Sequence, residues 1–260
     1  GPIYNTDVYT ISSINLGQKN ILDLSGLEYF SSLSNILLNN NWCPFNLSPI
    51  ENLTNIRELN LGSNNIVDIT AIANLTNMTK LNLVVNDVVD IYPLANMTNV
   101  TSLLLEFNEI VDITPLSGLT KVTYLDISDN HITNVAALGN LTGITFLDLS
   151  NNQVSDITPL GNCTNLTNLN LCLNPISDIS AVQYMTRLNT LVINVGILED
   201  ISPLANLTSL YSLNLTNNNI SDISPLANLT NLRVLYLLGN PLNAEALNII
   251  YSLQAGGTRV

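Results

Sequence analysis

Residues 112–132 read DITPLSGLTKVTYLDISDNHI, and residues 222–242 read DISPLANLTNLRVLYLLGNPL. Both stretches follow the repeating unit LxxLxLxxNxIxDIxPLxNLTN, which is 22 residues long. Ile14 and Ile36 continue the series toward the N-terminus, although the step from Ile36 to Leu59 is 23 residues. The central leucine recurs along the rest of the chain at Leu59, Leu81, Leu103, Leu125, Leu147, Leu169, Leu191, Leu213 and Leu235. The period predicts about eleven stacked repeats.

Apolar and polar side chains alternate at the centre of each repeat. In Leu81, Asn82 and Leu83, this alternation predicts a short strand whose leucines point inward. Stacked strands form a parallel sheet, and the rest of each repeat returns along the opposite face. We therefore predict an α/β solenoid of the leucine-rich repeat class. A curved parallel β-sheet forms its concave face, short 3₁₀ or turn segments form its convex face, and a helix caps its C-terminus.

An asparagine recurs five positions after the central leucine, where the chain turns inward. Because a buried amide must be hydrogen-bonded, we expect these side chains to satisfy backbone groups of the turns. Lys19 and Gly196 interrupt the series, and we expect looser turns there. We also expect a bulge or distorted turn at residues 41–45, which carry the extra residue of the long step. The asparagines are Asn64, Asn86, Asn108, Asn130, Asn152, Asn174, Asn218 and Asn240.

Two further positions indicate how the convex segments begin. A hydroxyl residue followed by proline is typical of an N-cap before the first helical position. This pair occurs at Thr114-Pro115, Thr158-Pro159, Ser202-Pro203 and Ser224-Pro225. An aspartate also occurs once in most repeats, which favours a structural, turn-stabilising role over a functional one; its members are Asp68, Asp90, Asp112, Asp156, Asp178, Asp200 and Asp222.

The ends of the chain differ from the middle. Gly1-Pro2 is typical of a cleaved tag, so residues 1–13 are interpreted as a tag remnant and a partial N-terminal cap, too short to shield the first core layer well. The repeat array spans residues 14–242. Residues 243–260 form the C-terminal cap: Asn243 is a predicted N-cap, Gly256-Gly257 ends the helix, and residues 258–260 add a final strand. The predicted apolar stripe of this helix comprises Ala246, Leu247, Ile250, Tyr251 and Leu253.

Composition narrows the class of partner. Twenty acidic residues against seven basic ones give a net charge of −13, which disfavours nucleic acid and anionic membrane surfaces. No apolar run is long enough for direct membrane insertion. The cysteines Cys43, Cys163 and Cys172 lie at no metal-binding spacing and are interpreted as free thiols. The sequence indicates no cofactor and no metal, and it leaves the oligomeric state open.

Together with GLEYFSSLSN at residues 26–35, these repeats closely resemble those of the internalin family of Gram-positive bacterial surface proteins. The resemblance covers nearly everything from Ile11 to Leu242. It implies a helical N-terminal cap, a curved array, an immunoglobulin-like module after it and a cell-wall anchor, with host receptors bound by the concave face. The helical C-terminal cap and the three cysteines differ from the usual pattern. No single binding residue is implied, because such residues lie at variable strand positions.

The outward strand positions of the middle repeats combine aromatic and acidic side chains. Tyr124 and Phe146 occupy the same position in neighbouring repeats, as do Asp126 and Asp148, so each pair should lie about 5 Å apart. Aromatic residues favour interface hot spots, and paired carboxylates favour a partner with a basic patch. Alternatively, the aromatics cover their neighbours and the acids are solvated. The candidate ligand-binding residues are Leu104, Glu106, Phe107, Tyr124, Asp126, Asp129, Phe146 and Asp148.

A second, apolar group lies in the following repeats and either extends that surface, forms a separate contact or arises by chance. Its members are Cys172, Leu173, Val192, Val195 and Ile197.

We expect no enzymatic activity. Asp126, Asp129, Asp148 and the single histidine, His131, fall in two neighbouring repeats, and carboxylates at close range can act as acid and base. The sequence contains no nucleophile motif and no Gly-rich phosphate loop, and a shallow curved sheet offers no deep pocket. We therefore expect a protein-recognition module of the adhesin type, extracellular or on the cell surface. A cytoplasmic scaffold or regulatory subunit and a self-associating surface-layer element are the alternatives.

Overall fold

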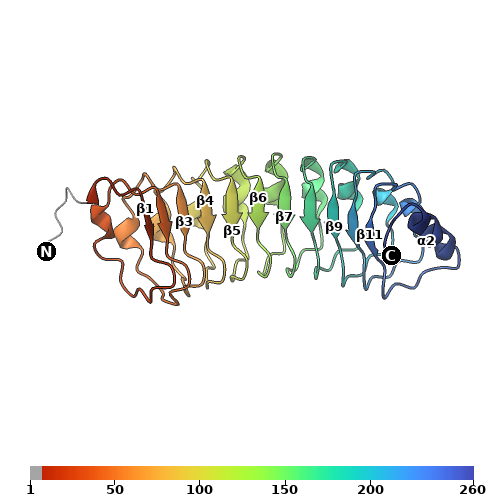
Figure 1. Cartoon of the computed structure of the whole chain (residues 1–260), viewed down its shortest axis with the longest axis horizontal. Helices are drawn as coiled ribbons and strands as arrows, with labels where there is room; N and C mark the ends of the chain where they lie inside the picture. Colours follow the sequence, from red (N-terminus) through yellow and green to blue (C-terminus); the bar gives the residue numbers. More distant parts are fainter. Residues whose placement is uncertain (1–7) are drawn as a thin grey trace. The chain divides into compact units, whose positions relative to one another are not determined.

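The computed structural model describes residues 8–260 (Figure 1). The chain divides into two compact units, of which the first ends at Asn130 and the second runs from His131 to Val260. Each unit has the same architecture. The predicted tag remnant and much of the predicted partial N-terminal cap lie outside the described residues.

The described part of the first unit contains six parallel strands, each three residues long, and each of the first five pairs with the strand that follows it. The central residues are in register, so Leu59 lies opposite Leu81 and Leu103 opposite Leu125. The strands are β1 (Ser13–Asn15), β2 (Asn35–Leu37), β3 (Glu58–Asn60), β4 (Lys80–Asn82), β5 (Ser102–Leu104) and β6 (Tyr124–Asp126). The 3₁₀ segments are η1 (Leu27–Tyr29), η2 (Ser48–Ile50), η3 (Thr70–Ile72), η4 (Tyr92–Leu94) and η5 (Thr114–Gly118).

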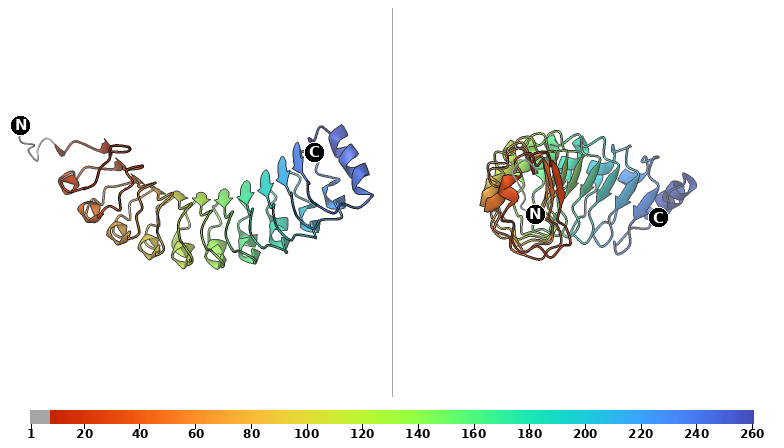
Figure 2. Two further views of the ribbon diagram at one scale, coloured as in Figure 1. Left: turned by 90° about the horizontal axis from the view of Figure 1, so that it is seen from below. Right: turned by 60° about the vertical axis from the view of Figure 1, so that its left-hand side comes forward.

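The second unit repeats this arrangement with five parallel strands. They are β7 (Phe146–Asp148), β8 (Asn168–Asn170), β9 (Thr190–Val192), β10 (Ser212–Asn214) and β11 (Val234–Tyr236). Its 3₁₀ segments are η6 (Ala136–Asn140), η7 (Thr158–Asn162), η8 (Ser180–Tyr184), η9 (Ser202–Leu204) and η10 (Ser224–Leu226), and one α-helix follows, α2 (Ala246–Ala255). Within each unit the strands lie on one side and the 3₁₀ segments on the other (Figure 2).

The inward leucines form the core of each unit. In the repeat of β4, Leu81 and Leu83 are buried, whereas Lys80 is exposed and Asn82 half-buried. The predicted leucine-rich repeat solenoid with short 3₁₀ segments and a C-terminal capping helix is confirmed. We call the outward surface formed by the strands and the turns directly after them the strand face.

The first core layer is less shielded than those behind it. Ile14 is only half-buried, whereas Ile36, its counterpart in the next repeat, is fully buried. A cavity of about 680 Å³ opens beside Ile14, lined by apolar side chains that include Leu16, Leu24 and Phe30.

The predicted asparagine ladder is present and is dense in hydrogen bonds. Asn86 Nδ2 donates to the carbonyls of Leu83 (2.9 Å) and Leu61 (3.1 Å), in its own repeat and the preceding one. Asn86 Oδ1 accepts the N–H groups of Ile66 (2.9 Å) and Asn64 (3.2 Å). Each ladder amide therefore joins two consecutive turns.

The ladder starts one repeat earlier than predicted, at Asn41. Its side chain donates to the carbonyls of Leu16 and Leu38 and accepts the N–H groups of Lys19 and Ile21. Asn41 lies five positions after Ile36, so the spacing that identified the other ladder asparagines also applies to it.

The extra residue of that repeat lies in the return segment, not in the strand. β2 pairs with β3 over all three residues, so the strand register is undisturbed. A tight turn in which Phe45 N–H donates to Cys43 O at 2.8 Å takes up the additional length, and Phe45 is buried. Of the two predicted forms, the structure has the distorted turn.

A second asparagine ladder, which sequence analysis did not detect, runs four positions before the central leucine. Asn77 Nδ2 donates to Thr54 O at 2.9 Å, and Asn99 Nδ2 donates to Thr76 O at 3.1 Å. Asn165 and Asn231 make the same bond in the second unit. These side chains are more exposed than those of the first ladder, and each makes fewer hydrogen bonds.

The recurring aspartates begin the 3₁₀ segments. Asp112 Oδ1 accepts the N–H of Thr114 at 2.8 Å, and Asp156 Oδ1 accepts that of Thr158 at the same distance. The structural interpretation of these aspartates is confirmed. The predicted hydroxyl N-cap was wrong, because Thr114 lies inside η5 and its hydroxyl donates to Asp112 instead of accepting a backbone N–H.

The same hydrogen bonds give a testable dependence on pH. Backbone and hydroxyl donors hold the pKa of Asp112, Asp156 and Asp222 below the ordinary value of 3.8. The resulting stabilisation is complete above that pH and is lost as the pH falls through the lowered pKa values. Asn134 occupies the same position and accepts the N–H of Ala136 at 2.8 Å, so asparagine preserves the turn.

We therefore expect the triple variant Asp112→Asn, Asp156→Asn, Asp222→Asn to have the same thermal stability as the wild type at about pH 7. On acidification to about pH 2.5, it should lose less thermal stability than the wild type does. Thermal unfolding followed by circular dichroism at both pH values measures the difference. Parallel losses in the two proteins on acidification would contradict this role.

One residue per repeat adopts a left-handed backbone conformation directly before the ladder position. Asparagine and serine occupy several of these sites, but Val85, Phe107, Leu173 and Val195 also occur there, with φ between 52° and 58°. Branched or bulky side chains are strained in this region, and asparagine tolerates it. Sequence analysis did not identify this position.

Replacing Val85 with asparagine should therefore raise the free energy of unfolding by about 1 kcal/mol. Urea denaturation measures the change. Val89 supplies the matched control, because it is exposed in the same repeat and lies outside the left-handed region. Equal effects of Val85→Asn and Val89→Asn would show that polarity, not backbone strain, explains the result.

The C-terminal segment covers the last core layer. Asn243 Oδ1 accepts the N–H groups of Glu245 and Ala246, and the helix ends before Gly256 and the left-handed Gly257, as predicted. The final residues pair with β11 only through one bridge, between Val234 and Arg259.

The predicted apolar stripe of α2 was partly wrong. Ala246 and Leu253 are buried and Ile250 is half-buried, but Leu247 and Tyr251 are exposed.

Candidate functional site

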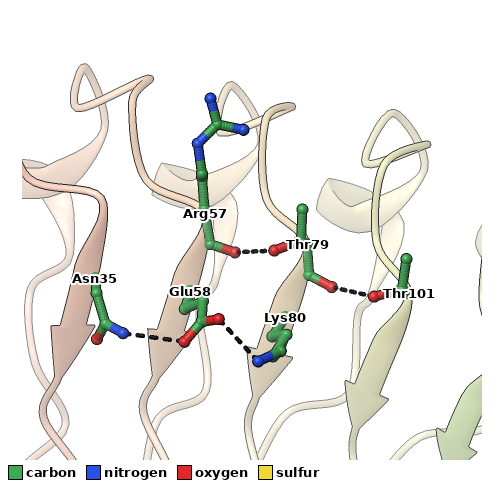
Figure 3. Close-up of polar contacts among 6 residues, drawn as sticks. All are labelled: Asn35, Arg57, Glu58, Thr79, Lys80 and Thr101. Atoms are coloured by element: carbon green, nitrogen blue, oxygen red, sulfur yellow. Dashed lines mark hydrogen bonds and ion pairs between the residues drawn. The ribbon is translucent and has the colours of Figure 1, made fainter.

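The strand face of the first unit begins with a chain of polar contacts across β2, β3 and β4 (Figure 3). Asn35 Nδ2 donates to Glu58 Oε2 at 3.0 Å, and Lys80 Nζ lies 2.8 Å from Glu58 Oε1. Beside it, the hydroxyls of Thr79 and Thr101 donate to carbonyls of the preceding repeats (Figure 3). These side chains largely satisfy one another, so this part of the face is polar and internally bonded.

A shallow groove of about 180 Å³ runs along the same strands and ends at Leu104 on β5. Leu37 and Leu104 lie at its two ends, with Asn60 and Asn82 between them at the same strand position. At this strand position, a leucine on each side therefore flanks two asparagines.

Beyond Leu104 lie the two aromatic candidates of the first unit. Tyr124 opens β6 and is exposed, opposite Ser102 of β5. Phe107 follows β5 with 52% of its side chain exposed, and its N–H donates to Ser128 O at 3.2 Å. The first unit thus presents Leu104, Phe107 and Tyr124 from adjacent repeats.

The acidic candidates of the first unit differ in environment. Asp126 is only 8% exposed, and its Oδ1 accepts the N–H (3.1 Å) and the hydroxyl (2.7 Å) of Ser128. Glu106 and Asp129 are half-buried, and Asp129 is another residue in the left-handed conformation. Asp126 thus has a turn-stabilising role in its own repeat, which sequence analysis did not assign to it.

The remaining two candidates belong to the second unit. Phe146 is half-buried at the start of β7, opposite Asn168. Asp148 Oδ1 accepts the N–H and hydroxyl of Ser150 at 2.9 and 2.6 Å, and its Oδ2 accepts Asn170 Nδ2 at 2.8 Å. The predicted proximity of Tyr124 to Phe146 and of Asp126 to Asp148 joins residues of different units and stays a prediction.

Asp126 and Asp148 belong to a series of Asn and Asp side chains one position after the central leucine. Each accepts the N–H two residues ahead, as Asn82 does from Val84 and Asn214 from Thr216. The recurrence of Asn or Asp before a small residue could have indicated this turn, since such side chains commonly bond the backbone two residues on.

The described residues give no support to a metal or catalytic centre. Among residues 8–260, no group of three or more His, Cys, Asp and Glu side chains is placed to hold a metal ion. His131 is exposed in the turn after the sixth strand.

The structure is similar to that of an internalin (inlF) from Listeria monocytogenes, with 33% sequence identity and a TM-score of 0.88. The alignment covers 96% of this chain and 80% of the Listeria chain. The chain belongs to the internalin family. A second Listeria internalin, internalin C2, is 31% identical over 90% of this chain and 84% of its own, with a TM-score of 0.53.

Other comparisons support the leucine-rich repeat fold. Residues 120–162 and 208–249 match the family model described as leucine-rich repeats in two copies. The ectodomain of the Arabidopsis thaliana receptor kinase GASSHO1/SCHENGEN3, solved in complex with Casparian strip integrity factor 2, is 22% identical, with a TM-score of 0.78. That alignment covers 90% of this chain and 30% of the receptor. The chain has no significant match among curated proteins.

Leucine-rich repeat proteins with this fold, which include internalins and receptor ectodomains, are protein-interaction modules. Within the described part of the chain, no helix is long and apolar enough to cross a membrane.

Proposed function

We propose that this internalin is a secreted or surface-displayed recognition domain that binds a protein ligand through its strand face. The contact residues are the eight strand-face candidates, with Phe107, Tyr124 and Phe146 as apolar anchors. The acidic members favour a ligand with a basic patch. The proposed activity is binding without catalysis.

Phe107 carries this proposal. It places a large apolar ring in solvent, at a backbone position where its φ of 52° disfavours a bulky side chain. Neither the exposure of the Phe107 ring nor its backbone conformation stabilises the fold, so a contribution to stability does not explain why phenylalanine occurs at this position. Interfaces, by contrast, obtain much of their binding energy from aromatic anchors.

The proposal predicts that Phe107→Ser, Tyr124→Ser, Phe146→Ser lowers ligand capture at least tenfold, because each lost aromatic anchor removes about 1 kcal/mol or more of binding energy. Immobilised wild-type and variant domains are exposed to host-cell surface extract and to cytosolic extract, each at low and raised salt. Captured proteins are identified by mass spectrometry, and the affinity of each purified ligand is then measured.

The matched control replaces exposed tyrosines of the 3₁₀ segments, as Tyr29→Ser, Tyr92→Ser, Tyr184→Ser. This control should retain capture, and both triple variants should keep a thermal midpoint near that of the wild type. A salt-sensitive ligand from the surface extract supports the proposal. Equal capture by the wild type and the strand-face variant, capture of a cytosolic enzyme alone, or capture of nothing but the domain itself contradicts it.

A further inference from the structure

A depression of about 450 Å³ lies in the second unit, on the turns that follow β8 and β9. Its apolar lining is formed by Leu173, Pro175, Val195 and Ile197, with Gly196 among them. Three asparagines complete the lining: Asn151, Asn174 and Asn217. Leu173, Val195 and Ile197 are each about half exposed. The depression lies at the turn edge of the strand face, and no candidate contact residue of the proposed function lines it.

The depression exists where the asparagine ladder is interrupted. We expected a looser turn at Gly196. The backbone hydrogen bond to the next repeat is nevertheless kept, since Gly196 N–H donates to Asn217 O at 3.1 Å. Because residue 196 is glycine, this turn has no ladder side-chain amide. Ile176 N–H, which that amide would accept, donates instead to Asn174 O at 2.9 Å. A Cβ atom at position 196 would lie 2.8 Å from Asn218 Oδ1. Glycine therefore permits this local packing, and an asparagine would not fit without a shift.

The walls of the depression are unfavourable for stability. Leu173 and Val195 both adopt the left-handed conformation, with φ of 54° and 58°. Asparagine occupies the same position in the repeats on either side, at Asn151 and Asn217, so the fold accepts the less strained residue there. Asn194, directly before Val195, also has a buried Oδ1 without a hydrogen-bond partner among the described residues. Two strained and exposed apolar side chains at one depression indicate a contact role.

The charges in and near the depression indicate which kind of ligand side chain would bind there. The residues lining the depression are uncharged, while Glu199 and Asp200 are exposed close to Ile197 in the chain. With a net charge of −13, a second copy of this chain would be repelled. We infer that this depression binds a branched aliphatic or aromatic side chain of the protein ligand, and that the next residue of the ligand is basic. This inference rests on the proposed protein-binding function.

Disulfide tethering tests the depression without any protein ligand. Cys172 precedes Leu173 and is half-buried, while Cys43, also half-buried, lies in the first unit and supplies an internal reference. Burial raises the pKa of Cys163 to about 11, so that thiol should not react in the folded protein. The protein is equilibrated with isobutyl, benzyl and hydroxyethyl disulfides in the presence of mercaptoethanol, and the adducts at each cysteine are quantified by mass spectrometry.

We expect the ratio of isobutyl to hydroxyethyl adducts to be about tenfold higher at Cys172 than at Cys43, because the depression buries the apolar group. An added ammonium group should raise capture of the isobutyl fragment at Cys172 relative to Cys43. Glu199→Gln should remove that preference. Equal isobutyl ratios at the two cysteines would overturn the apolar site, and an unchanged ammonium preference in Glu199→Gln would overturn the basic neighbour.

The double variant Leu173→Asn, Val195→Asn provides the matched comparison. It should lose the isobutyl preference while its thermal midpoint rises, because backbone strain is relieved. Val85→Asn relieves the same strain in the first unit and should leave adduct ratios unchanged. A double variant that keeps the isobutyl preference overturns the inference. Since tethering uses no ligand, its failure is separate from a failure of ligand capture.

Discussion

Replacing Asn86 with alanine should lower the free energy of unfolding by about 3 to 5 kcal/mol. The truncation removes the amide but leaves its partners in place. The carbonyls of Leu61 and Leu83 each keep one amide donor, from Asn64 and Asn108, whereas the N–H groups of Ile66 and Asn64 lose their acceptor. Asn86 is 7% exposed, so water reaches these groups poorly, and each unsatisfied buried group costs about 1 to 3 kcal/mol.

Urea denaturation of the full chain measures this loss, with circular dichroism and tyrosine fluorescence as two independent probes. Asn77→Ala is the matched control, because Asn77 makes one hydrogen bond to a neighbouring repeat from an exposed position. Its effect should stay below about 1 kcal/mol. Similar losses in the two variants would mean that the buried ladder contributes no more than an exposed hydrogen bond.

Leu253→Ala should destabilise the C-terminal end by about 2 to 4 kcal/mol. Leu253 is 5% exposed and is the largest fully apolar side chain that α2 buries. Its removal leaves a cavity over the last core layer, against which α2 packs. Thermal unfolding and amide hydrogen exchange of β10 and β11 measure the loss, which should be greatest in those strands.

Leu247→Ala in the same helix is the matched control. Leu247 is 57% exposed, so the same substitution should change stability by less than about 0.5 kcal/mol. The pair also tests the orientation of α2, since the sequence pattern placed both leucines on the core side. Equal losses would show that Leu247 is buried in solution.

Much of the scaffold was predictable because its physical requirements recur every repeat. Alternating leucines predicted the strands. The asparagine that recurs five positions after the central leucine in most repeats predicted the ladder. The features that were missed also recur but have weaker residue preferences. The left-handed position accepts Val85, Phe107 and Asn151 alike, so only backbone angles identify it. The hydrogen bond that the Ser128 hydroxyl donates to Asp126 was not predicted, because an outward-facing aspartate on a strand is compatible both with ligand contact and with a bond to its own turn.

The candidate site was less predictable than the scaffold for a related reason. Strand-face residues need not repeat, so periodicity carries no information about them. The depression at Gly196 depends on a local departure from the consensus, and its geometry follows from the positions of Leu173 and Ile197 around the missing amide. The sequence identified these apolar residues but not the depression they form.

The asparagine ladder also determines how mechanical load would pass along each unit. The hydrogen bonds of Asn174 and Asn218 run to the repeat before them, so tension on the chain ends loads one pair of neighbouring repeats at a time. Stretching should therefore peel repeats away in succession, not shear the whole array at once. Gly196 removes one of these connections, which makes its repeat the weakest link of the second unit under traction.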